Sequence, residues 1–284
     1  TKDSLIHQGI FYKPTKSRYS AILWVHGLTD NFYGDLSTLE ALGECCEKEG
    51  WGLASFNTRG HDIIASVKKL DPQNPKGQTS VSLGSSYEKF SECVYDIDAA
   101  ITFLKHQGFA QVILAGISTG ANKVCYYAGT QRDPRVAAVV LASPLGDVPI
   151  ESKEPKFTHN LKRAKQFVLK GQGDRLLEGI TYLPLTAKRY LSLYQSGTVE
   201  DVFDYYVKQP KLTVFSKITK PLCIVFGGAD EYSDRPVKDI LAVLRKYQKS
   251  KNYHEAIIPG AFHSLGGKEK EFVKTLTPWL NSLK

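Results

Sequence analysis

The residues best suited to chemistry in this chain centre on Ser118, inside the pentapeptide GISTG at positions 116–120. The pentapeptide follows the apolar run Val112–Ala115 and precedes a helical pattern that begins near Ala121. A G-x-S-x-G sequence between a strand and a helix is typical of a nucleophile elbow, a strained turn that exposes the serine hydroxyl. Glycines on both sides of the serine let the strand and the helix pass without a Cβ clash. This context favours Ser118 as a nucleophile over a plain Gly/Ser-rich turn.

A serine hydroxyl needs a base, and the base needs a partner that fixes its tautomer. Asp230 follows the apolar run Leu222–Phe226, and His263 follows Ala256–Ile258. Each candidate therefore comes just after its own strand, so both can converge with Ser118 at one edge of a sheet. The order serine, acid, histidine is the one that accompanies this type of elbow.

Other residues compete for these two roles. Glu231 and Asp234 share the loop of Asp230, which makes the acid the less certain member of the set. His61 is the one serious rival to His263 as the base, but it precedes the nucleophile. The remaining histidines do not follow a strand in this order: His7, His106, His159 and His254.

Two backbone N–H groups are expected to complete the site as an oxyanion hole. Such groups stabilise the negative charge that develops on a carbonyl oxygen during acyl transfer. One donor is expected from Thr119, the residue after the nucleophile, and the other from Leu28, in the loop after the first strong strand. His26 ends that strand, and its side chain is expected to be a buried hydrogen-bonding group rather than a catalyst.

Short apolar runs alternate with amphipathic stretches, a pattern typical of a mostly parallel sheet flanked by helices. The expected strands are Gly9–Tyr12, Ala21–Val25, Gly52–Phe56, Gln111–Ala115, Val136–Ala142, Leu222–Phe226 and His254–Ile258. The expected helices are Leu36–Glu49, Tyr87–Gln107, Ala121–Gly129, Arg235–Lys249 and Lys268–Ser282. We therefore predict an α/β fold whose core comprises residues 1–145 and 221–284.

The alternation stops between residues 146 and 220, where a helical cap inserted after the sixth strand is predicted. Helices are expected near His159–Lys170, Thr186–Gln195 and Val199–Val207. Aromatic residues at helical spacing usually pack a lid against the body of a protein. The functional alternative is an aromatic substrate pocket, for which Tyr190, Tyr194 and Tyr206 are the first candidates. Basic residues in this segment would favour an anionic substrate.

Composition excludes several classes of function. The net charge is +8, but the Lys and Arg residues are scattered and no nucleic-acid-binding module accompanies them. No metal-binding motif and no dinucleotide-binding G-x-G-x-x-G is present, so neither a metal nor a cofactor is expected. No apolar run reaches the ~18 residues of a membrane span. The odd number of cysteines, five, favours free thiols in the cytoplasm, and the oligomeric state is left open.

The segments described above resemble the α/β-hydrolase superfamily from about Gly9 to the C-terminus. More narrowly, FNTRGHD at 56–62, LASP at 141–144, GGADEY and PGAFHS resemble a poorly characterised microbial and fungal esterase-like group. This resemblance implies the α/β-hydrolase fold, the triad Ser118, Asp230 and His263, and the two oxyanion donors. It places Arg59, His61 and Asp62 near the mouth of the site, where a hydrogen-bonded brace is favoured over a ligand contact.

These observations predict a serine hydrolase that cleaves a small carboxylic ester through an acyl-enzyme. The choice of an ester rests on analogy with the fold alone. A thioesterase, an amidase and a C–C bond hydrolase are alternatives with the same site. A ligand receptor that retains the triad without turnover is an alternative of another class, and turnover separates it from an esterase.

Overall fold

The computed structural model describes residues 1–16 and 19–283. Seven strands form one sheet in the order β1-β3-β2-β6-β7-β10-β11, and only β1 is antiparallel to its neighbour. The strands are β1 (Gly9–Tyr12), β2 (Ser20–Val25), β3 (Gly52–Phe56), β6 (Gln111–Ile117), β7 (Val136–Ala142), β10 (Leu222–Gly227) and β11 (Tyr253–Ile258). The prediction of a mostly parallel sheet is confirmed.

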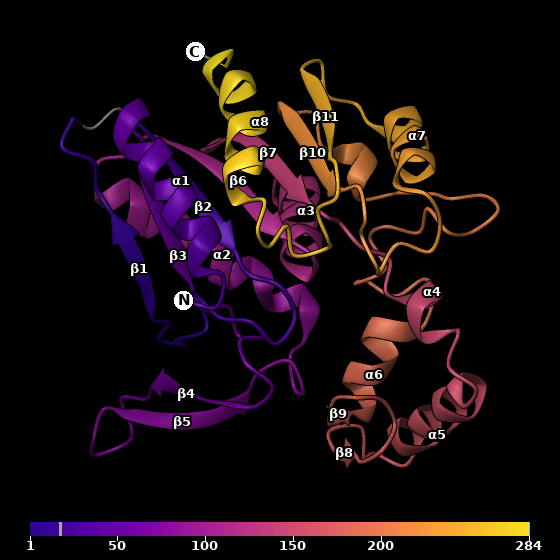
Figure 1. Ribbon diagram of the computed structural model, residues 1–284. Helices are drawn as coiled ribbons and strands as arrows, with labels where there is room; N and C mark the ends of the chain where they lie inside the picture. Colours follow the sequence, from indigo (N-terminus) through magenta and orange to yellow (C-terminus); the bar gives the residue numbers. More distant parts are fainter. Residues whose placement is uncertain (17–18, 284) are drawn as a thin grey trace.

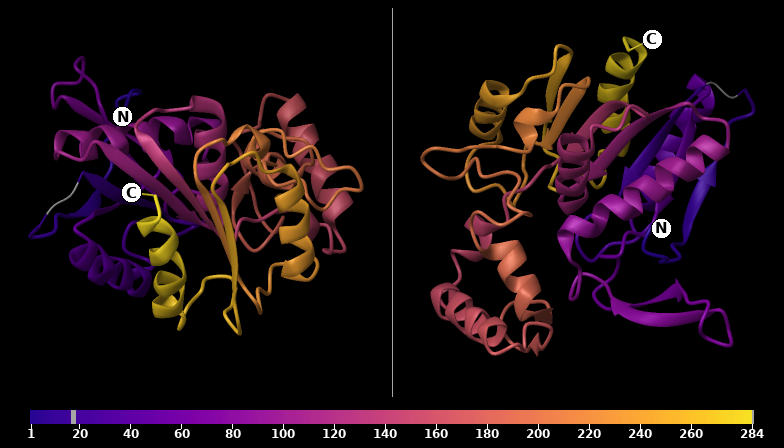
Figure 2. Two further views of the ribbon diagram at one scale, coloured as in Figure 1. Left: turned by 90° about the horizontal axis from the view of Figure 1, so that it is seen from above. Right: turned by 180° about the vertical axis from the view of Figure 1, so that it is seen from behind.

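Helices cover both faces of the twisted sheet (Figures 1 and 2). Helices α1 (Leu36–Glu49) and α8 (Glu269–Asn281) pack together on one face. Helices α2 (Cys93–His106), α3 (Thr119–Gln131) and α7 (Val237–Tyr247) contribute to the core on the other face. The 3₁₀ turn η1 (Phe90–Glu92) precedes α2. The central strands are buried on both sides, which explains their near-continuous apolar sequences.

The register of the parallel strands brings their following loops together. Val25 at the end of β2 pairs with Gly116 in β6, so the loop after β2 lies beside the GISTG turn. Gly227 of β10 pairs with Ile258 of β11, so the loops after these two strands are also neighbours. Loops that leave the carboxyl ends of adjacent parallel strands meet at one edge of the sheet.

A hairpin that the sequence analysis missed extends from the body as an arm (Figure 1). It consists of the antiparallel strands β4 (Ala65–Leu70) and β5 (Gln78–Leu83). The segment 146–220 follows β7, which is the fifth strand of the main sheet along the chain and the seventh overall, not the sixth.

Residues 146–220 are here called the inserted segment. The segment contains α4 (Val148–Glu151), α5 (Phe157–Leu169), α6 (Ala187–Tyr194), the short strand pair β8 (Leu176–Leu177) and β9 (Leu185–Thr186), and the 3₁₀ turn η2 (Phe215–Lys217). The part of it that contains α4, α5 and α6 lies below the sheet in Figure 1. Helices α5 and α6 share a hydrophobic cluster that is separate from the two cores of the sheet.

The helix predicted at Val199–Val207 is wrong, because this stretch is non-helical. Phe203 and Tyr205 are instead buried in the core on the α2–α3 side of the sheet. The Asp204 carboxylate accepts hydrogen bonds from the backbone N–H groups of Lys211 and Leu212. A carboxylate that binds backbone N–H groups offers the chain an alternative to a helix.

Candidate active site

Ser118, His263 and Asp230 lie together at the carboxyl edge of the sheet. His263 Nε2 is 2.9 Å from Ser118 Oγ. His263 Nδ1 is 2.9 Å and 3.1 Å from the two carboxylate oxygens of Asp230. The histidine and the aspartate are 7% and 8% exposed, so water has little access to the contact between them. This geometry is the one that a nucleophile, a base within hydrogen-bond reach and an orienting acid require.

The backbone at Ser118 has the conformation of an elbow. Its φ of 54° and ψ of −129° lie in a region that residues with a side chain rarely adopt. A Cβ at Gly120 would lie 2.2 Å from the Val25 carbonyl oxygen, and one at Gly116 would lie 2.6 Å from the Gly120 carbonyl oxygen. The two glycines are therefore required for β6 and α3 to meet at this turn.

The carboxylate that contacts the ring of His263 belongs to Asp230 and not to its two alternatives. Glu231 accepts a hydrogen bond from the backbone N–H of His263, at 2.8 Å, and so positions the loop rather than the ring. Asp234 pairs with Arg235 at 2.7 Å. The backbone N–H of Tyr232 donates to Asp230 at 3.0 Å, which holds the carboxylate in place.

Leu28 and Thr119 can both supply a free backbone N–H to the site. Neither N–H has a hydrogen-bond acceptor among residues 1–16 and 19–283. Thr119 is the first residue of α3, where an N–H has no partner inside the helix. The loop of Leu28 passes close to the nucleophile, since a Cβ at Gly27 would lie 3.3 Å from that of Ser118. Both residues line the same cavity as Ser118.

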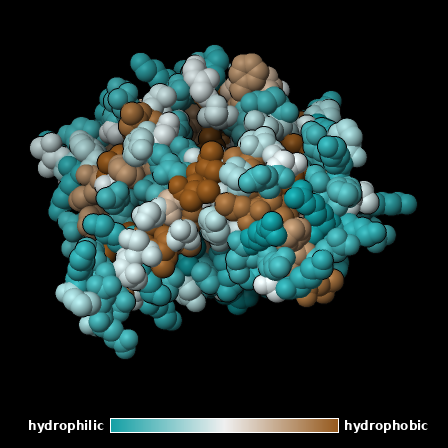
Figure 3. Space-filling view, turned by 90° about the horizontal axis from the view of Figure 1, so that it is seen from below, coloured by the Kyte–Doolittle hydropathy of each residue, from teal (hydrophilic) through white to brown (hydrophobic). Residues whose placement is uncertain are grey.

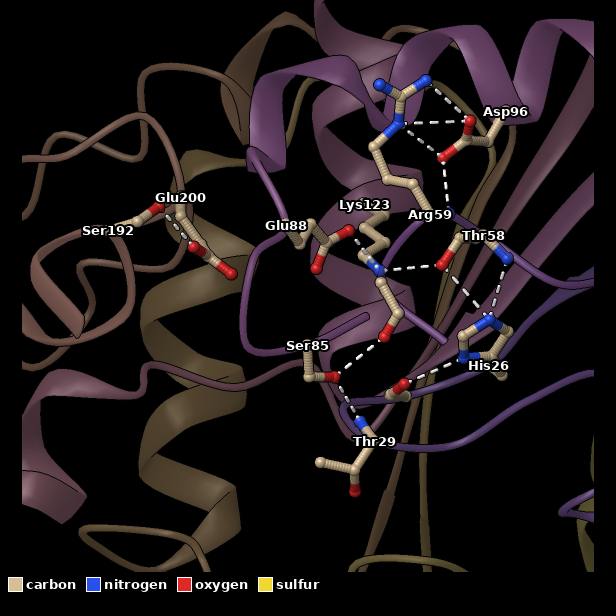
Figure 4. A network of polar contacts seen from close by, with 12 residues as sticks. His26, Thr29, Thr58, Arg59, Ser85, Glu88, Asp96, Lys123, Ser192 and Glu200 are labelled. Carbon is tan, nitrogen blue, oxygen red and sulfur yellow. Dashed lines mark hydrogen bonds and ion pairs between the residues drawn. The ribbon is translucent and has the colours of Figure 1, made fainter. Parts of the chain in front are cut away.

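The loop after β2 is braced by polar contacts that Figure 4 shows in part. Thr29 has a φ of 60°, and its N–H donates to the Ser85 hydroxyl at 2.8 Å. The same hydroxyl donates to the Gly60 carbonyl oxygen at 2.8 Å. Asp62 accepts from the Asn31 side-chain amide at 2.8 Å. The loop that carries Leu28 is thus held by residues of the FNTRGHD segment and by Ser85.

The residues of the FNTRGHD segment brace the site and do not line its cavity. Arg59 is 1% exposed and pairs with Asp96 through its guanidinium and its backbone N–H. His61 pairs with Asp62, at 2.9 Å. The expected position near the mouth of the site is therefore wrong for Arg59, whose charge is directed into the body of the protein.

His26 is buried and has a structural role. Its Nδ1 lies 2.9 Å from the Gly27 carbonyl oxygen, and its Nε2 accepts from the Thr58 backbone N–H at 3.0 Å. Burial, with the nearby Lys123 adding to it, lowers the pKa of His26 to about 3. The ring is therefore neutral at physiological pH and fixes the junction between the loops after β2 and β3.

A buried ionic network joins the inserted segment to the body. Arg189 of α6 pairs with Glu88 at 3.1 Å and also with Glu200. Glu88 pairs in turn with Lys123 of α3 at 2.7 Å. The Arg189 side chain also donates to the carbonyl oxygen of Ser85, at 3.0 Å. Figure 4 shows how closely the charges of Glu88 and Lys123 approach the contact between Ser85 and Thr29.

A cavity of about 610 Å³ opens onto the triad. Its walls come from the loops after β2, β6, β7, β10 and β11 and from the inserted segment, and Ser118, Thr119, Leu28 and His263 are among them. The Leu28 side chain also packs against the hydrophobic cluster of α5 and α6. Seen from below, hydrophobic side chains gather around a hollow on the same side of the molecule as the inserted segment (Figure 3).

The three candidate tyrosines are placed differently. Tyr194 lines the cavity. Tyr190 is fully buried inside the inserted segment, and its hydroxyl donates to Glu151 at 3.1 Å. The Tyr206 hydroxyl donates to Asp201 at 2.8 Å. Tyr190 and Tyr206 do not line the cavity, so helical spacing identified one wall residue and two packing residues.

Sequence reasoning missed the acidic walls of the cavity, which carry Asp30, Asp35, Asp147 and Glu151. Asp147 offered a signal, because it lies just beyond the end of β7 at the carboxyl edge of the sheet. No Lys or Arg lines the cavity within the described part of the chain, which is contrary to the expected basic rim. No group of three or more His, Cys, Asp or Glu residues within the described ranges could hold a metal ion.

Among the described residues, no helix is long and apolar enough to cross a membrane. All five cysteines are buried and free.

Solved structures of hydrolases share this architecture at low sequence identity. Est1E from Butyrivibrio proteoclasticus, solved with bound ferulic acid, is 19% identical with a TM-score of 0.64, over 99% of this chain and 96% of that one. Siderophore hydrolase EstB from Aspergillus fumigatus is 17% identical with a TM-score of 0.67, over 98% and 95% of the two chains. Monoglyceride lipase from Saccharomyces cerevisiae is 15% identical with a TM-score of 0.64, over 99% and 93%.

A search of curated proteins found no similar sequence. A family described as "Protein of unknown function (DUF1749)" matches residues 77–281, well over half of the chain. The chain therefore has the α/β-hydrolase fold and belongs to the DUF1749 family.

Proposed function

We propose that the protein is a serine hydrolase that cleaves a carboxylic ester through an acyl-enzyme. The observation that carries this proposal is the hydrogen-bonded series from Ser118 through His263 to Asp230, with both contacts at 2.9 Å, at the wall of a 610 Å³ cavity. The esterases and lipases that share the fold support the proposal by analogy alone, because each is under 20% identical to this chain.

The first half of the reaction forms the acyl-enzyme. Ser118 Oγ attacks the ester carbonyl carbon while His263 Nε2 takes the hydroxyl proton. The carbonyl oxygen becomes an oxyanion that accepts hydrogen bonds from the N–H groups of Leu28 and Thr119. Asp230 stabilises the imidazolium that forms. When the intermediate collapses, His263 gives the proton to the leaving alcohol.

The second half releases the acid. His263 now takes a proton from water, and the resulting hydroxide attacks the acyl carbon. Collapse of the second intermediate breaks the bond to Ser118 Oγ, which regains the proton from His263. The products are one alcohol and one carboxylic acid, and the enzyme returns to its starting state.

We further propose that the inserted segment is a cap over the site, on a core of residues 1–145 and 221–284. Tyr182 and Tyr194 of this segment line the cavity together with Ser118 and His263. Binding energy from remote parts of a substrate assists the reaction only if the walls hold those parts in the transition state. The segment is therefore the part of the chain that would set substrate preference.

The test combines covalent labelling with turnover. A fluorophosphonate should label wild-type protein at Ser118, and Ser118→Ala should abolish the label. The same substitution should lower kcat for p-nitrophenyl esters by about three orders of magnitude or more, with the fold intact. Labelling at another serine would overturn the assignment of the nucleophile. Labelling of Ser118 without multiple turnover of any ester, thioester or amide would favour the receptor.

A further inference from the structure

The cavity at the triad carries four carboxyl groups, of which Asp147 has a longer-range attraction to the buried Arg189. Asp30, Asp35, Asp147 and Glu151 all line it. None of the four forms a salt bridge with any residue in 1–16 or 19–283. This is unusual in a chain of net charge +8, where an unpaired carboxylate has many possible partners. Charged groups that are removed from water are normally paired.

Glu151 is the most buried of the four, at 5% exposed. Among the described residues, its side chain accepts hydrogen bonds only from neutral hydroxyls, those of Tyr190 at 3.1 Å and Thr181 at 3.4 Å. Burial raises the pKa of Glu151 above its ordinary value. Burial, with Glu200 adding to it, raises the pKa of Asp147 to about 8. Both carboxyl groups are thus poorly stabilised as anions, and a bound cation would stabilise them.

Aromatic rings share the walls with these carboxyls. Tyr182, Tyr194 and Tyr232 line the same cavity. The face of a tyrosine ring attracts ammonium and guanidinium groups, most strongly where water is excluded. Carboxyl groups and tyrosine rings around one cavity supply the two kinds of group that bind organic cations. A metal ion does not fit, because no cluster of three or more ligands of suitable type exists in the described chain.

A second cavity of about 610 Å³ adjoins the first at the inserted segment. The two share Ile150, Glu151, Tyr182 and Tyr232, so Glu151 lies at their junction. The second cavity also has both a negative and a positive side chain on its wall, Glu154 and Lys156. The cavity on the side of the triad therefore has acidic side chains without basic ones on its wall.

We propose that the substrate carries an ammonium or guanidinium group, and that Asp147 and Glu151 hold this cation beside the ester under attack. The proposal rests on the serine-hydrolase function above and names the chemical class of its substrate. It replaces the basic rim and the anionic substrate that sequence composition suggested. Asp147 and Glu151 act here in binding, while the chemistry remains with Ser118, His263 and Asp230.

The experiment compares esters that differ in charge and little in shape. For a cation on the alcohol side, the pair is acetylcholine and 3,3-dimethylbutyl acetate. For a cation on the acyl side, the pair is p-nitrophenyl 6-aminohexanoate and p-nitrophenyl heptanoate. We expect kcat/KM to favour the cationic member of at least one pair by about tenfold or more. Asp147→Asn and Glu151→Gln should each reduce this ratio several-fold.

The matched control is Asp174→Asn, which removes one negative charge from an exposed position of the same segment. This variant should leave the charge preference of both pairs unchanged. Because Asp147→Asn or Glu151→Gln could also alter folding, the four esters are titrated into folded Ser118→Ala protein by calorimetry. This variant cannot turn them over, and the cationic member should bind more tightly.

Failure of this inference and failure of the proposed function give different results. Equal or better turnover of the neutral ester in both pairs, with Ser118 labelled and active, would overturn the cationic substrate alone. A cationic preference that both Asp147→Asn and Glu151→Gln leave unchanged would overturn the roles of these residues. Absence of labelling and of turnover for every ester would overturn the proposed function, and the calorimetric comparison would still decide on the cation.

Discussion

Replacing Ser85 by alanine tests whether a buried hydroxyl outside the triad positions the oxyanion hole. The Ser85 hydroxyl is fully buried, accepts from the N–H of Thr29 at 2.8 Å and donates to the Gly60 carbonyl oxygen at 2.8 Å. Thr29 follows Leu28 directly, so this contact fixes the backbone that carries one expected oxyanion donor. Ser85→Ala removes both hydrogen bonds and adds no volume.

The expected magnitudes follow from these two hydrogen bonds. Each contributes about 1 kcal/mol net, so the free energy of unfolding should fall by about 2 kcal/mol. Loss of a whole oxyanion donor costs about 10²–10³ in kcat, and a displacement of about 1 Å costs up to about 10². We therefore expect kcat to fall roughly tenfold to a hundredfold. KM should change little, because the oxyanion donor that Ser85 positions contacts the substrate mainly in the transition state.

The assay uses p-nitrophenyl acetate, together with the affinity of a boronic acid that mimics the tetrahedral intermediate. Boronate affinity should weaken in parallel with kcat/KM. Ser86→Ala is the matched control, because the neighbouring Ser86 is equally buried and its hydroxyl has no hydrogen-bond partner in the described chain. If Ser85→Ala loses stability but keeps kcat and boronate affinity within twofold of wild type, Ser85 is a structural brace only.

Three further predictions concern the inserted segment and the ionic networks. Arg189→Met leaves two buried carboxylates without this partner and should lower the free energy of unfolding by about 3–5 kcal/mol in urea titrations. Lys188→Met, at the exposed neighbouring ion pair, should change it by less than about 1 kcal/mol; similar losses for both would refute the network. Tyr194→Ala should change the ranking among long p-nitrophenyl esters, whereas Tyr206→Phe, which removes a hydroxyl outside the cavity, should preserve that ranking; equal scaling of all esters by Tyr194→Ala would refute a selective wall. Burial raises the pKa of Asp96, but hydrogen bonds and charges from a histidine and an arginine outweigh this and lower it to about 2. Because the folded pKa is depressed, the Asp96 carboxylate should stabilise the fold by roughly 2 kcal/mol above pH 4 and lose this contribution as the pH falls from 4 to 2. In Asp96→Asn, the free energy of unfolding should therefore depend less on pH between 4 and 2.

Much of the sheet was predictable because its signals are local. The apolar run Val136–Ala142 is uninterrupted, and its predicted bounds are those of β7. The hairpin β4–β5 was missed although alternating residues in Ala65–Leu70 are buried and exposed. At Val199–Val207, tertiary contacts override the local helical pattern, because Phe203 and Tyr205 pack into the core of the body. Local pattern cannot foresee such contacts.

The triad was proposed from sequence because each member follows its own strand, and parallel strands bring such positions together. Two residues of the acidic walls had no comparable signal, because Asp35 precedes a helix and Glu151 ends a short one. Their convergence on one cavity depends on where the inserted segment folds back, which no spacing in the sequence encodes. The same reason separates Tyr194 from Tyr190, since one helical turn decides which ring reaches the cavity.

The unpaired carboxyl groups of the cavity also have a consequence for product release. In the proposed reaction a neutral acyl group enters and a carboxylate forms beside Asp147 and Glu151 only after hydrolysis. The new negative charge meets walls that carry acidic side chains and no Lys or Arg in the described chain, so no cation of the walls stabilises it there. The acid product should therefore leave readily and inhibit weakly, while an alcohol product that carries the cation should remain longer. The walls would thus weaken inhibition by the acid product without changing the equilibrium of hydrolysis.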